Sequence, residues 1–538
     1  MRPRLFSFVL CALLFCSGVS AQTLTPAATA AANALTFGDN AEKVATLKTL
    51  TDQPDPALLP LLEALAADAL YAVEGTEGSP PRWLIVDEAG QAVDALTGQA
   101  AELPADAVAV TINNRVRGAL ALALAAQRLS SPDDAQRRAA IDALREAPTP
   151  ALMPLLETAL QKESVSSIRQ RIAVVRAMIQ LEEAPTDPAT RLAAMKTLGE
   201  TSDPAIRQLL EPWTQHADTA LAKAARAAIS DIDFRLTQGE VLGQLFTGLS
   251  LASILLLAAL GLAVVYGLMG VINMAHGELI LIGAYATYVV QALFRQYLPG
   301  AFDWYPLAAL PVAFLAAALV GIALERLVIR HLYGRPLETL LATWGISLIL
   351  IQAARMIFGA QNVAVENPAW LSGGIEVFSN LTLPYNRLAI IAFAVTALVA
   401  VWLLLARTRL GLFVRAVTQN RPMARALGVA TGRVDALTFG LGAGLAGLAG
   451  CALSQVGNVG PELGQGYIVD SFMVVVLGGV GQLAGTVYAA LGVGVLSKVL
   501  EGFSGAVLAK IFILIAVIAF IQKRPQGIFA LKGRFADA

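Results

Sequence analysis

The stretch RTRLGLFVRAVTQNRPMARALGVATGR, residues 407–433, separates two long apolar runs at residues 388–406 and 436–453. It contains six arginines and no acidic residue. In membrane proteins, the loops that stay on the cytoplasmic side are enriched in arginine and lysine. The stretch therefore predicts a cytoplasmic loop between two membrane-spanning helices. This part of the chain is accordingly predicted to be a membrane bundle.

The same loop has the pattern of two short helices. The first has an apolar face, made by Leu412, Phe413, Ala416 and Val417. Pro422 fits the first turn of the second helix, which Gly428 closes. Helices this short are marginal alone in water, so the pair is expected to fold against a partner surface. The alternative is that the arginines only set the topology and contact lipid headgroups.

The composition divides the chain into two parts. Of its 538 residues, 56% are hydrophobic and only 15% are charged, whereas soluble proteins have about 25% charged residues. Most charges precede residue 240, and nearly all the long apolar runs follow it. A soluble domain at residues 22–236 and a membrane domain at residues 237–538 are predicted. The formal net charge of -1 provides no basic surface, so nucleic acid is not an expected partner.

Residues 1–21 are typical of a secretory signal peptide. Arg2 and Arg4 precede a short apolar segment at residues 5–15, and small residues at 19–21 suit cleavage. A membrane span needs about 20 apolar residues, so the segment is short for an anchor, although an uncleaved anchor is the alternative. Cleavage would leave Cys451 as the only cysteine, and no intrachain disulfide is then expected.

The part that would be exported repeats itself. Residues 47–63 and 141–157 share their spaced leucines and a Pro-x-Pro-Ala-Leu core, and residues 195–211 form a looser copy. Each unit is expected to form a helix, a turn and a helix, as in a HEAT-like repeat, and stacked units form an α-solenoid. Between the first two copies, residues 74–114 predict a small β insertion. The solenoid either receives a partner or braces the membrane domain.

The membrane domain has about nine apolar segments. They lie at approximately residues 242–266, 271–293, 305–329, 337–358, 387–406, 434–455, 468–482, 485–503 and 507–521. Nine crossings that begin outside end inside, which places the arginine-rich loop and the basic C-terminal tail on the same side. The predicted fold is all-α, a polytopic membrane bundle of about nine spans preceded by the exported solenoid.

Glycines recur along these segments, and small residues let helices approach closely. The glycines expected to pack in this way are Gly440, Gly444, Gly447, Gly478, Gly479, Gly481 and Gly485. Residues 442–447 match a dinucleotide fingerprint, but the βαβ context that this motif requires is absent. The sequence has no Gly-x-x-x-x-Gly-Lys-Ser/Thr loop and no metal-binding or catalytic spacing. Neither an enzyme nor a bound cofactor or metal is expected.

Polar residues inside membrane spans are costly and therefore indicate function. Asn273 and His276 interrupt the junction of the first two segments, while Thr343 and Gln352 lie on related faces of a later one. These four are the predicted substrate-pathway residues. Hydrogen bonds between helices are the alternative explanation.

Three motifs follow one another in the membrane domain: YGLMGVINMAHGEL at residues 266–279, GLFVRAVTQNRPMARALG at 411–428 and LGGVGQLAGT at 477–486. In this order they resemble the permease subunits of ATP-binding-cassette importers of the branched-chain amino-acid type. Within that family, the exported extension and the tail FIQKRPQGIF at 520–529 resemble the urea-type permease.

The resemblance implies a multi-pass permease of the bacterial inner membrane that translocates urea by ATP-driven alternating access. Its N-terminal domain would be periplasmic and its C-terminus cytoplasmic. The implied partners are a second permease subunit, two cytoplasmic ATPase subunits and a periplasmic solute-binding protein, besides membrane lipid.

The resemblance also implies that the arginine-rich loop docks on an ATPase. The residues assigned to this coupling are Leu412, Phe413, Ala416, Asn420, Met423, Ala426, Leu427 and Gly428. One alternative is the same kind of permease for branched-chain amino acids or short amides. Alternatives of other classes are an ATP-independent channel for small solutes and a membrane-anchored scaffold.

Overall fold

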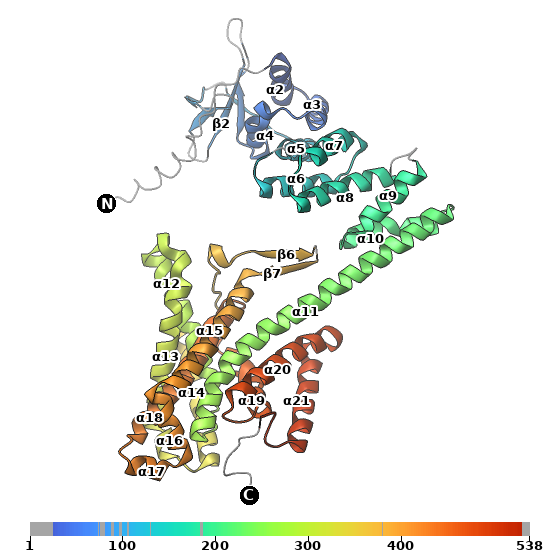
Figure 1. Ribbon diagram of the computed structural model, residues 1–538. Coiled ribbons are helices and arrows are strands. Elements are labelled where there is room, and N and C mark those ends of the chain that lie inside the picture. Colours follow the sequence, from blue (N-terminus) through green and yellow to red (C-terminus); the bar gives the residue numbers. More distant parts are fainter. Residues whose placement is uncertain are drawn as a thin grey trace. The chain divides into compact units, whose positions relative to one another are not determined.

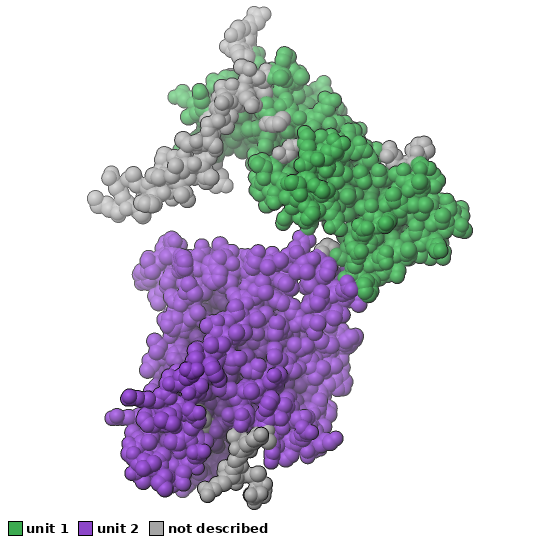
Figure 2. Space-filling model, viewed as in Figure 1, with its two compact units in different colours: residues 1–235 green, residues 236–538 purple. Residues whose placement is uncertain are grey.

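The computed structural model describes residues 25–529 except 74, 76–80, 88–90, 96–98, 105–106, 130, 183–186 and 379. The predicted signal peptide lies outside the described residues. The chain divides into two compact units, Met1–Arg235 and Leu236–Ala538 (Figure 2). One helix, α11 (Thr219–Met269), contributes residues to both units.

Short helices make up most of the first unit (Figure 1). They are α2 (Pro26–Phe37), α3 (Asn40–Asp52), η1 (Pro56–Leu58), α4 (Leu59–Ala66), α5 (Asn114–Arg128), α6 (Asp134–Glu146), η2 (Pro150–Leu152), α7 (Met153–Lys162), α8 (Ser166–Glu182), α9 (Pro188–Gly199), α10 (Pro204–Leu210) and η3 (Glu211–Gln215). The two repeated segments have the same local structure, because in each a Pro-Ala-Leu turn of 3₁₀ helix joins two α-helices. The stacking of such units into a HEAT-like solenoid stays a prediction.

A five-stranded antiparallel sheet interrupts these helices. Its strands are β1 (Leu70–Val73), β2 (Arg82–Val86), β3 (Ala92–Asp94), β4 (Ala100–Ala101) and β5 (Val108–Ala109), in the order β4-β3-β2-β1-β5. The sheet begins at Leu70, four residues before the predicted start of the β insertion at residue 74. The sequence did not show this first strand, because four residues are too few for an alternating pattern. Trp83 fixes the sheet to α2 by donating its indole N–H to the Thr36 hydroxyl over 3.2 Å.

A largely buried ion pair joins α6 to the connection between α7 and α8. Arg137 Nε donates to Glu163 Oε2 at 2.9 Å, and the Val165 backbone N–H donates to Glu163 Oε1 at 2.9 Å. Burial alone would raise the pKa of Glu163, but these hydrogen bonds lower it by more, so that the net pKa lies below the usual 4.5. A carboxylate with a lowered folded-state pKa stabilises the fold above its unfolded pKa. This contribution is therefore present at neutral pH and is lost in acid.

Replacing the Glu163 carboxylate removes that contribution. Glu163→Gln in the full-length protein is expected to lower amide hydrogen-exchange protection in α6 and α8 at pH 7. Because the variant has no carboxylate to protonate, its protection should fall less than that of the wild type as the pH drops below 4.5. The exposed Glu157 on α7 provides the control substitution, Glu157→Gln. Equal protection of wild type and Glu163→Gln at pH 7 would contradict the assignment.

The second unit is a bundle of long helices with a small hairpin. After α11 come α12 (His276–Tyr297), η4 (Pro299–Trp304), α13 (Tyr305–Leu327), η5 (Ile329–His331), α14 (Pro336–Phe358), η6 (Ala369–Leu371), β6 (Gly374–Phe378), β7 (Leu381–Pro384), α15 (Tyr385–Arg407), α16 (Arg409–Gln419), α17 (Arg421–Ala426), α18 (Thr431–Ser454), α19 (Leu463–Gly478), α20 (Leu483–Ser504) and α21 (Ala506–Lys523). The short helices α16 and α17 lie at the end of this unit opposite the β6–β7 hairpin (Figure 1).

Eight helices in the described part of the chain are long and apolar enough to cross a membrane. The remaining predicted span, at residues 468–482, corresponds to α19, a shorter apolar helix of 16 residues. Two boundaries differ from the sequence prediction. Residues 271–275 are not helical, and Gly479 and Gly481 lie in the turn between α19 and α20 rather than inside a span. Both glycines have positive φ, +97° and +78°, a conformation that other residues adopt only with strain.

The centre of the bundle depends on close helix contacts at small residues. A Cβ atom built on Gly447 of α18 would lie 2.5 Å from the Ala313 carbonyl oxygen and 2.6 Å from the Ala317 Cβ of α13. Gly447 also lies directly against Gly283 of α12. Because all three helices meet at this glycine, any side chain here pushes backbone against backbone.

Gly447→Ala is therefore expected to destabilise the bundle by about 1–3 kcal/mol through overpacking. The measurement is thermal unfolding of the purified protein in detergent. Gly345→Ala on α14 is the matched control, since no atom of the described residues lies within 4 Å of a Cβ built there. Equal stability of the two variants would show that the Gly447 contact has no energetic role.

Candidate functional site

A break in the helical backbone separates α11 from α12. Gly270 has φ +66°, and the chain leaves the helix until His276. Buried backbone N–H groups outside a helix must find other hydrogen-bond acceptors, and at the break side chains accept from two of them. The Asn273 side-chain oxygen accepts from the Ala275 N–H at 3.0 Å, and the Thr343 hydroxyl on α14 accepts from the Met274 N–H at 3.1 Å.

Asn273 and His276 are both buried at this break. The His276 Nε2 lies 3.0 Å from the carbonyl oxygen of Ala258 on α11. A carbonyl only accepts, so this nitrogen carries the proton and Nδ1 of the neutral ring is left as an acceptor. Neither His276 Nδ1 nor Asn273 Nδ2 has a hydrogen-bond partner in the described part of the structure.

A buried carboxyl group, that of Glu278, lies two residues after His276 on α12. Glu278 is 1% exposed and lies within reach of the Ser347 hydroxyl on α14, but its Oε2 has no hydrogen-bond partner among the described residues. Thr343 and Ser347 are four residues apart on α14, so their side chains are neighbours on one helix face, about 5–6 Å apart. The break and Glu278 therefore meet the same polar face of α14. We call Asn273, His276, Glu278, Thr343 and Ser347 the polar cluster.

The structure places the four predicted pathway residues unequally. Asn273, His276 and Thr343 belong to the polar cluster, whereas Gln352 is exposed. Gln352 lies about two and a half helical turns beyond Thr343, which puts it on the opposite face of α14. Sequence reasoning missed Glu278 as a site residue. Its signal was available, because a carboxyl group inside an apolar segment is costly and calls for an explanation.

The unpaired atoms define what the polar cluster can bind. Asn273 Nδ2 is a donor, His276 Nδ1 is an acceptor, and Glu278 Oε2 accepts when ionised. A buried polar atom without a partner costs free energy, so each can gain from a bond to a solute or to water. Among the described residues, no group of three or more His, Cys, Asp or Glu side chains could hold a metal ion.

The arginine-rich loop forms the second candidate site, at the end of the bundle that carries α16 and α17. Asn420 caps α17 by accepting from the Met423 N–H at 3.0 Å, Pro422 lies in its first turn, and Gly428 follows with φ +85°. One face of the helix pair is packed against α18. The buried residues of that face are Val414, Val417 and Ala424, which cluster with Val434 of α18.

The opposite face of the helix pair is apolar and exposed. It carries Leu412, Phe413, Met423 and Leu427, of which Leu427 is 78% exposed. The predicted apolar face of the first helix is corrected in part. Val417 lies on the packed face and Leu412 points away from it, whereas Phe413, four residues before Val417, lies at the edge of the packed face and is 39% exposed. Ala416 is half-buried, and Asn420, Ala426 and Gly428 are exposed. We call Leu412, Phe413, Met423 and Leu427 the exposed apolar face.

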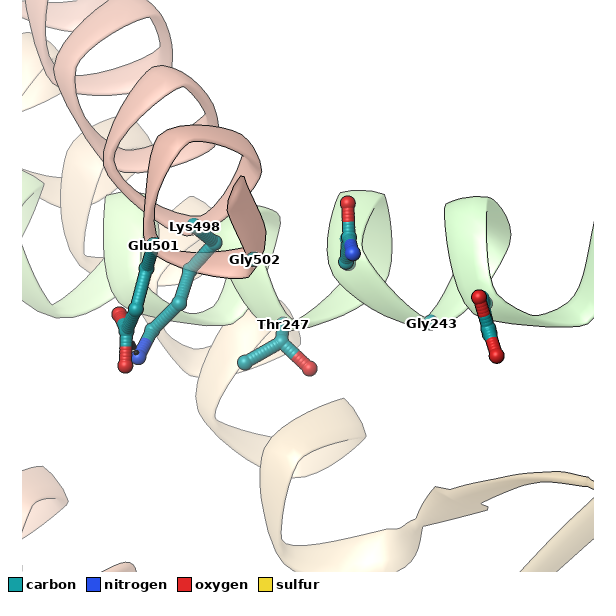
Figure 3. Close-up of a pocket in the computed structure, with 7 residues that line it drawn as sticks. Gly243, Thr247, Lys498, Glu501 and Gly502 are labelled. Carbon is teal, nitrogen blue, oxygen red and sulfur yellow. Dashed lines mark hydrogen bonds and ion pairs between the residues drawn. The ribbon is translucent and has the colours of Figure 1, made fainter. Parts of the chain in front are cut away.

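A pocket of about 410 Å³ lies between α11 and α20 (Figure 3). It is lined by Glu240, Gly243, Gln244, Thr247, Lys498, Glu501 and Gly502. Lys498 Nζ pairs with Glu501 Oε2 at 2.7 Å inside it. None of the predicted pathway residues lines this pocket.

Comparison with known proteins places the second unit in context. The family model described as "Branched-chain amino acid transport system / permease component" matches residues 244–521. The permease protein LivH of a Salmonella typhimurium branched-chain amino acid transport system is 31% identical over 295 residues, which cover 53% of this chain and 94% of that protein. Its counterpart BraD of Pseudomonas aeruginosa is 31% identical over 300 residues, covering 53% and 95%.

A weaker match is the ribose import permease RbsC of Escherichia coli, 29% identical over 137 residues, or 23% of this chain and 43% of that protein. No solved structure matches. Residues 1–243, which include the first unit, lie outside the family match.

Proposed function

This chain belongs to the family of permease components of branched-chain amino acid transport systems, and we propose that it is the membrane-spanning subunit of an ATP-binding-cassette importer for urea. Its partners would be a second permease, two cytoplasmic ATPase subunits and a periplasmic solute-binding protein. The first unit would lie in the periplasm, and α16, α17 and the C-terminus would lie in the cytoplasm.

The exposed apolar face is the observation that carries the importer proposal. Leu412 and Met423 are 59% and 57% exposed, although short helices in water normally turn such side chains inward. The other face of the same helix pair is already occupied by α18. An ATPase subunit that binds the exposed apolar face would thus be joined directly to the bundle, and its ATP-driven closure would move α18.

The polar cluster supports a small neutral solute. Urea has one carbonyl acceptor and four N–H donors, so its carbonyl matches Asn273 Nδ2 and its N–H groups match His276 Nδ1 and Glu278 Oε2. The described residues of the cluster include no arginine or lysine to hold a carboxylate. The first unit, which lies outside the family match and would be exported, also favours a specialised member of the family.

A branched-chain amino acid is the second candidate, because the relatives are named for such transport. The helices α12 and α19 begin next to each other, with Gly277 against Gly464. Two helix N-termini could offer their partial positive charge to an amino-acid carboxylate.

Competition between the two solutes tests the proposal. Cells that express the permease with its ATPase, second-permease and binding-protein genes are given radiolabelled urea with or without excess leucine. Urea uptake that leucine does not reduce is the expected result. If the cells instead take up leucine but not urea, and excess urea leaves the leucine uptake unchanged, the solute would be a branched-chain amino acid.

We also propose that the first unit is a HEAT-like solenoid. Deleting the first unit distinguishes its two suggested roles, which are receiving a partner and bracing the membrane domain. Loss of uptake in an assembled, membrane-inserted complex would give it a transport role, whereas loss of assembly would identify it as a brace.

A further inference from the structure

A buried group of charges lies where α17 meets the bundle. Arg421, the first residue of α17, forms an ion pair with Asp435 of α18. Its guanidinium carbon also lies 4.3 Å from the centroid of the Tyr333 ring, in the connection between α13 and α14. The Asp435 side chain is 4% exposed and that of Arg421 is 33% exposed. One arginine thus joins three parts of the unit.

A second carboxyl group, Glu325 of α13, shares this environment. It is buried, and its Oε2 has no hydrogen-bond partner in the part of the chain that the structure describes. The Arg326 Nε lies 3.5 Å from this oxygen, but Arg326 is half-exposed. The charge of Arg421 acts on Glu325 as well as on Asp435. Arg326 and Arg330 act on Glu325 more strongly than Arg421 does, so Asp435 is the buried carboxyl group that depends on Arg421.

The backbone of Arg421 is held in a fixed position. Asn420 caps the helix immediately before it, and Pro422 immediately after it has a fixed φ. Arg421 is also two residues from Met423 of the exposed apolar face. A partner that moves this face would move Arg421 with it.

The ion pair differs in kind from the apolar contacts around it. The contacts of Val414, Val417 and Ala424 with α18 are non-directional, whereas a charged hydrogen-bonded pair has a definite geometry. Separating it would leave a buried carboxylate without its counter-charge, which is strongly unfavourable. Asp435 should therefore follow Arg421. From Asp435, α18 continues to Gly447, where it lies against α12.

We propose that Arg421 is a positioning residue that transmits movement of α17 to α18 through Asp435, with Tyr333 orienting its guanidinium group. The inference rests on the proposed function, since the movement comes from the ATPase subunits. It assigns transmission to Arg421 and docking to the exposed apolar face, so the two roles are separable.

The test uses the complete importer in proteoliposomes and measures three quantities: ATPase association, ATP hydrolysis and solute transported per ATP. Arg421→Gln and Asp435→Asn should keep association and hydrolysis but transport at least about fivefold less solute per ATP, the lower end of typical coupling effects. Arg421→Lys, which keeps the charge, should lose less. Arg409→Gln is the matched control, because Arg409 is an exposed arginine of the neighbouring helix α16 and is not among the charges that act on Asp435.

Unchanged transport per ATP in both Arg421→Gln and Asp435→Asn would overturn the inference. Loss of ATPase association in them would also overturn it, since the pair would then form part of the dock, but the importer proposal would stand. A wild-type chain that binds no ATPase would instead refute the importer proposal. Tyr333→Leu leaves the charges of Arg421 and Asp435 in place. It should lower the solute transported per ATP by less than Arg421→Gln does, and it provides a second test if Asp435→Asn does not fold.

Discussion

Leu427→Asp is expected to abolish association with the ATPase subunits while leaving membrane insertion intact. Leu427 ends the exposed apolar face and makes little contact with its own chain, being 78% exposed. A charged side chain buried in an apolar interface must lose its hydration without gaining a partner. The loss should be at least about thirtyfold in affinity, as for a binding hot spot. Copurification of the ATPase subunits with the tagged permease measures it.

The control for Leu427→Asp is the same substitution at an equally exposed leucine. Leu337, at the start of α14, is 77% exposed and lies outside α16 and α17. Leu337→Asp should leave ATPase association unchanged. Ala416→Asp should also abolish association. Because Ala416 is half-buried, this variant can also disturb the folding of α16. If Leu427→Asp prevented insertion, residues 407–433 would be only a topology signal.

Glu278→Gln is expected to reduce solute uptake at least about tenfold, the equivalent of one hydrogen bond to a charged group. The substitution keeps the size of the side chain. A glutamine can still bond Ser347 through one end of its amide, but it cannot present a carboxylate to a solute. Uptake in cells that express the complete system measures the effect. Copurification with the ATPase subunits should be unchanged.

A second buried polar residue of α12 provides the control for Glu278→Gln. Thr287 is fully buried, but its hydroxyl donates to the Gly283 carbonyl oxygen within the same helix. Thr287→Val should therefore leave uptake nearly unchanged. If Glu278→Gln transported solute at the wild-type rate, the polar cluster would be a helix-packing feature, which is the alternative that the sequence left open.

Local patterns were predictable from the sequence where local physics decides them. Asn420, Pro422 and Gly428 define α17 because capping, a fixed φ and a positive φ act on a few neighbouring residues. The apolar spans follow from length and composition, and the family model and the relatives confirm the coarse identification as a permease.

Features that depend on tertiary packing were not predictable. Whether Val417 or Leu412 faces inward depends on where α18 packs, which the periodicity of α16 does not specify. Helical spacing alone puts Gln352 and Thr343 on opposite faces of α14, but which of these faces meets the break depends on packing. The partnership of Arg421 with Asp435 joins a loop to a span, and the sequence shows only that the loop contains arginines.

The dependence of transport on ATPase subunits tests the central claim most directly. Purified permease complex is reconstituted into proteoliposomes with and without its ATPase subunits, and solute uptake is measured with internal and external ATP controls. The account predicts uptake only when the ATPase subunits and ATP are present together on the side of α16 and α17, with ATP hydrolysis stimulated by the solute-loaded binding protein. Uptake that persists without the ATPase subunits would show an ATP-independent channel and would contradict the account.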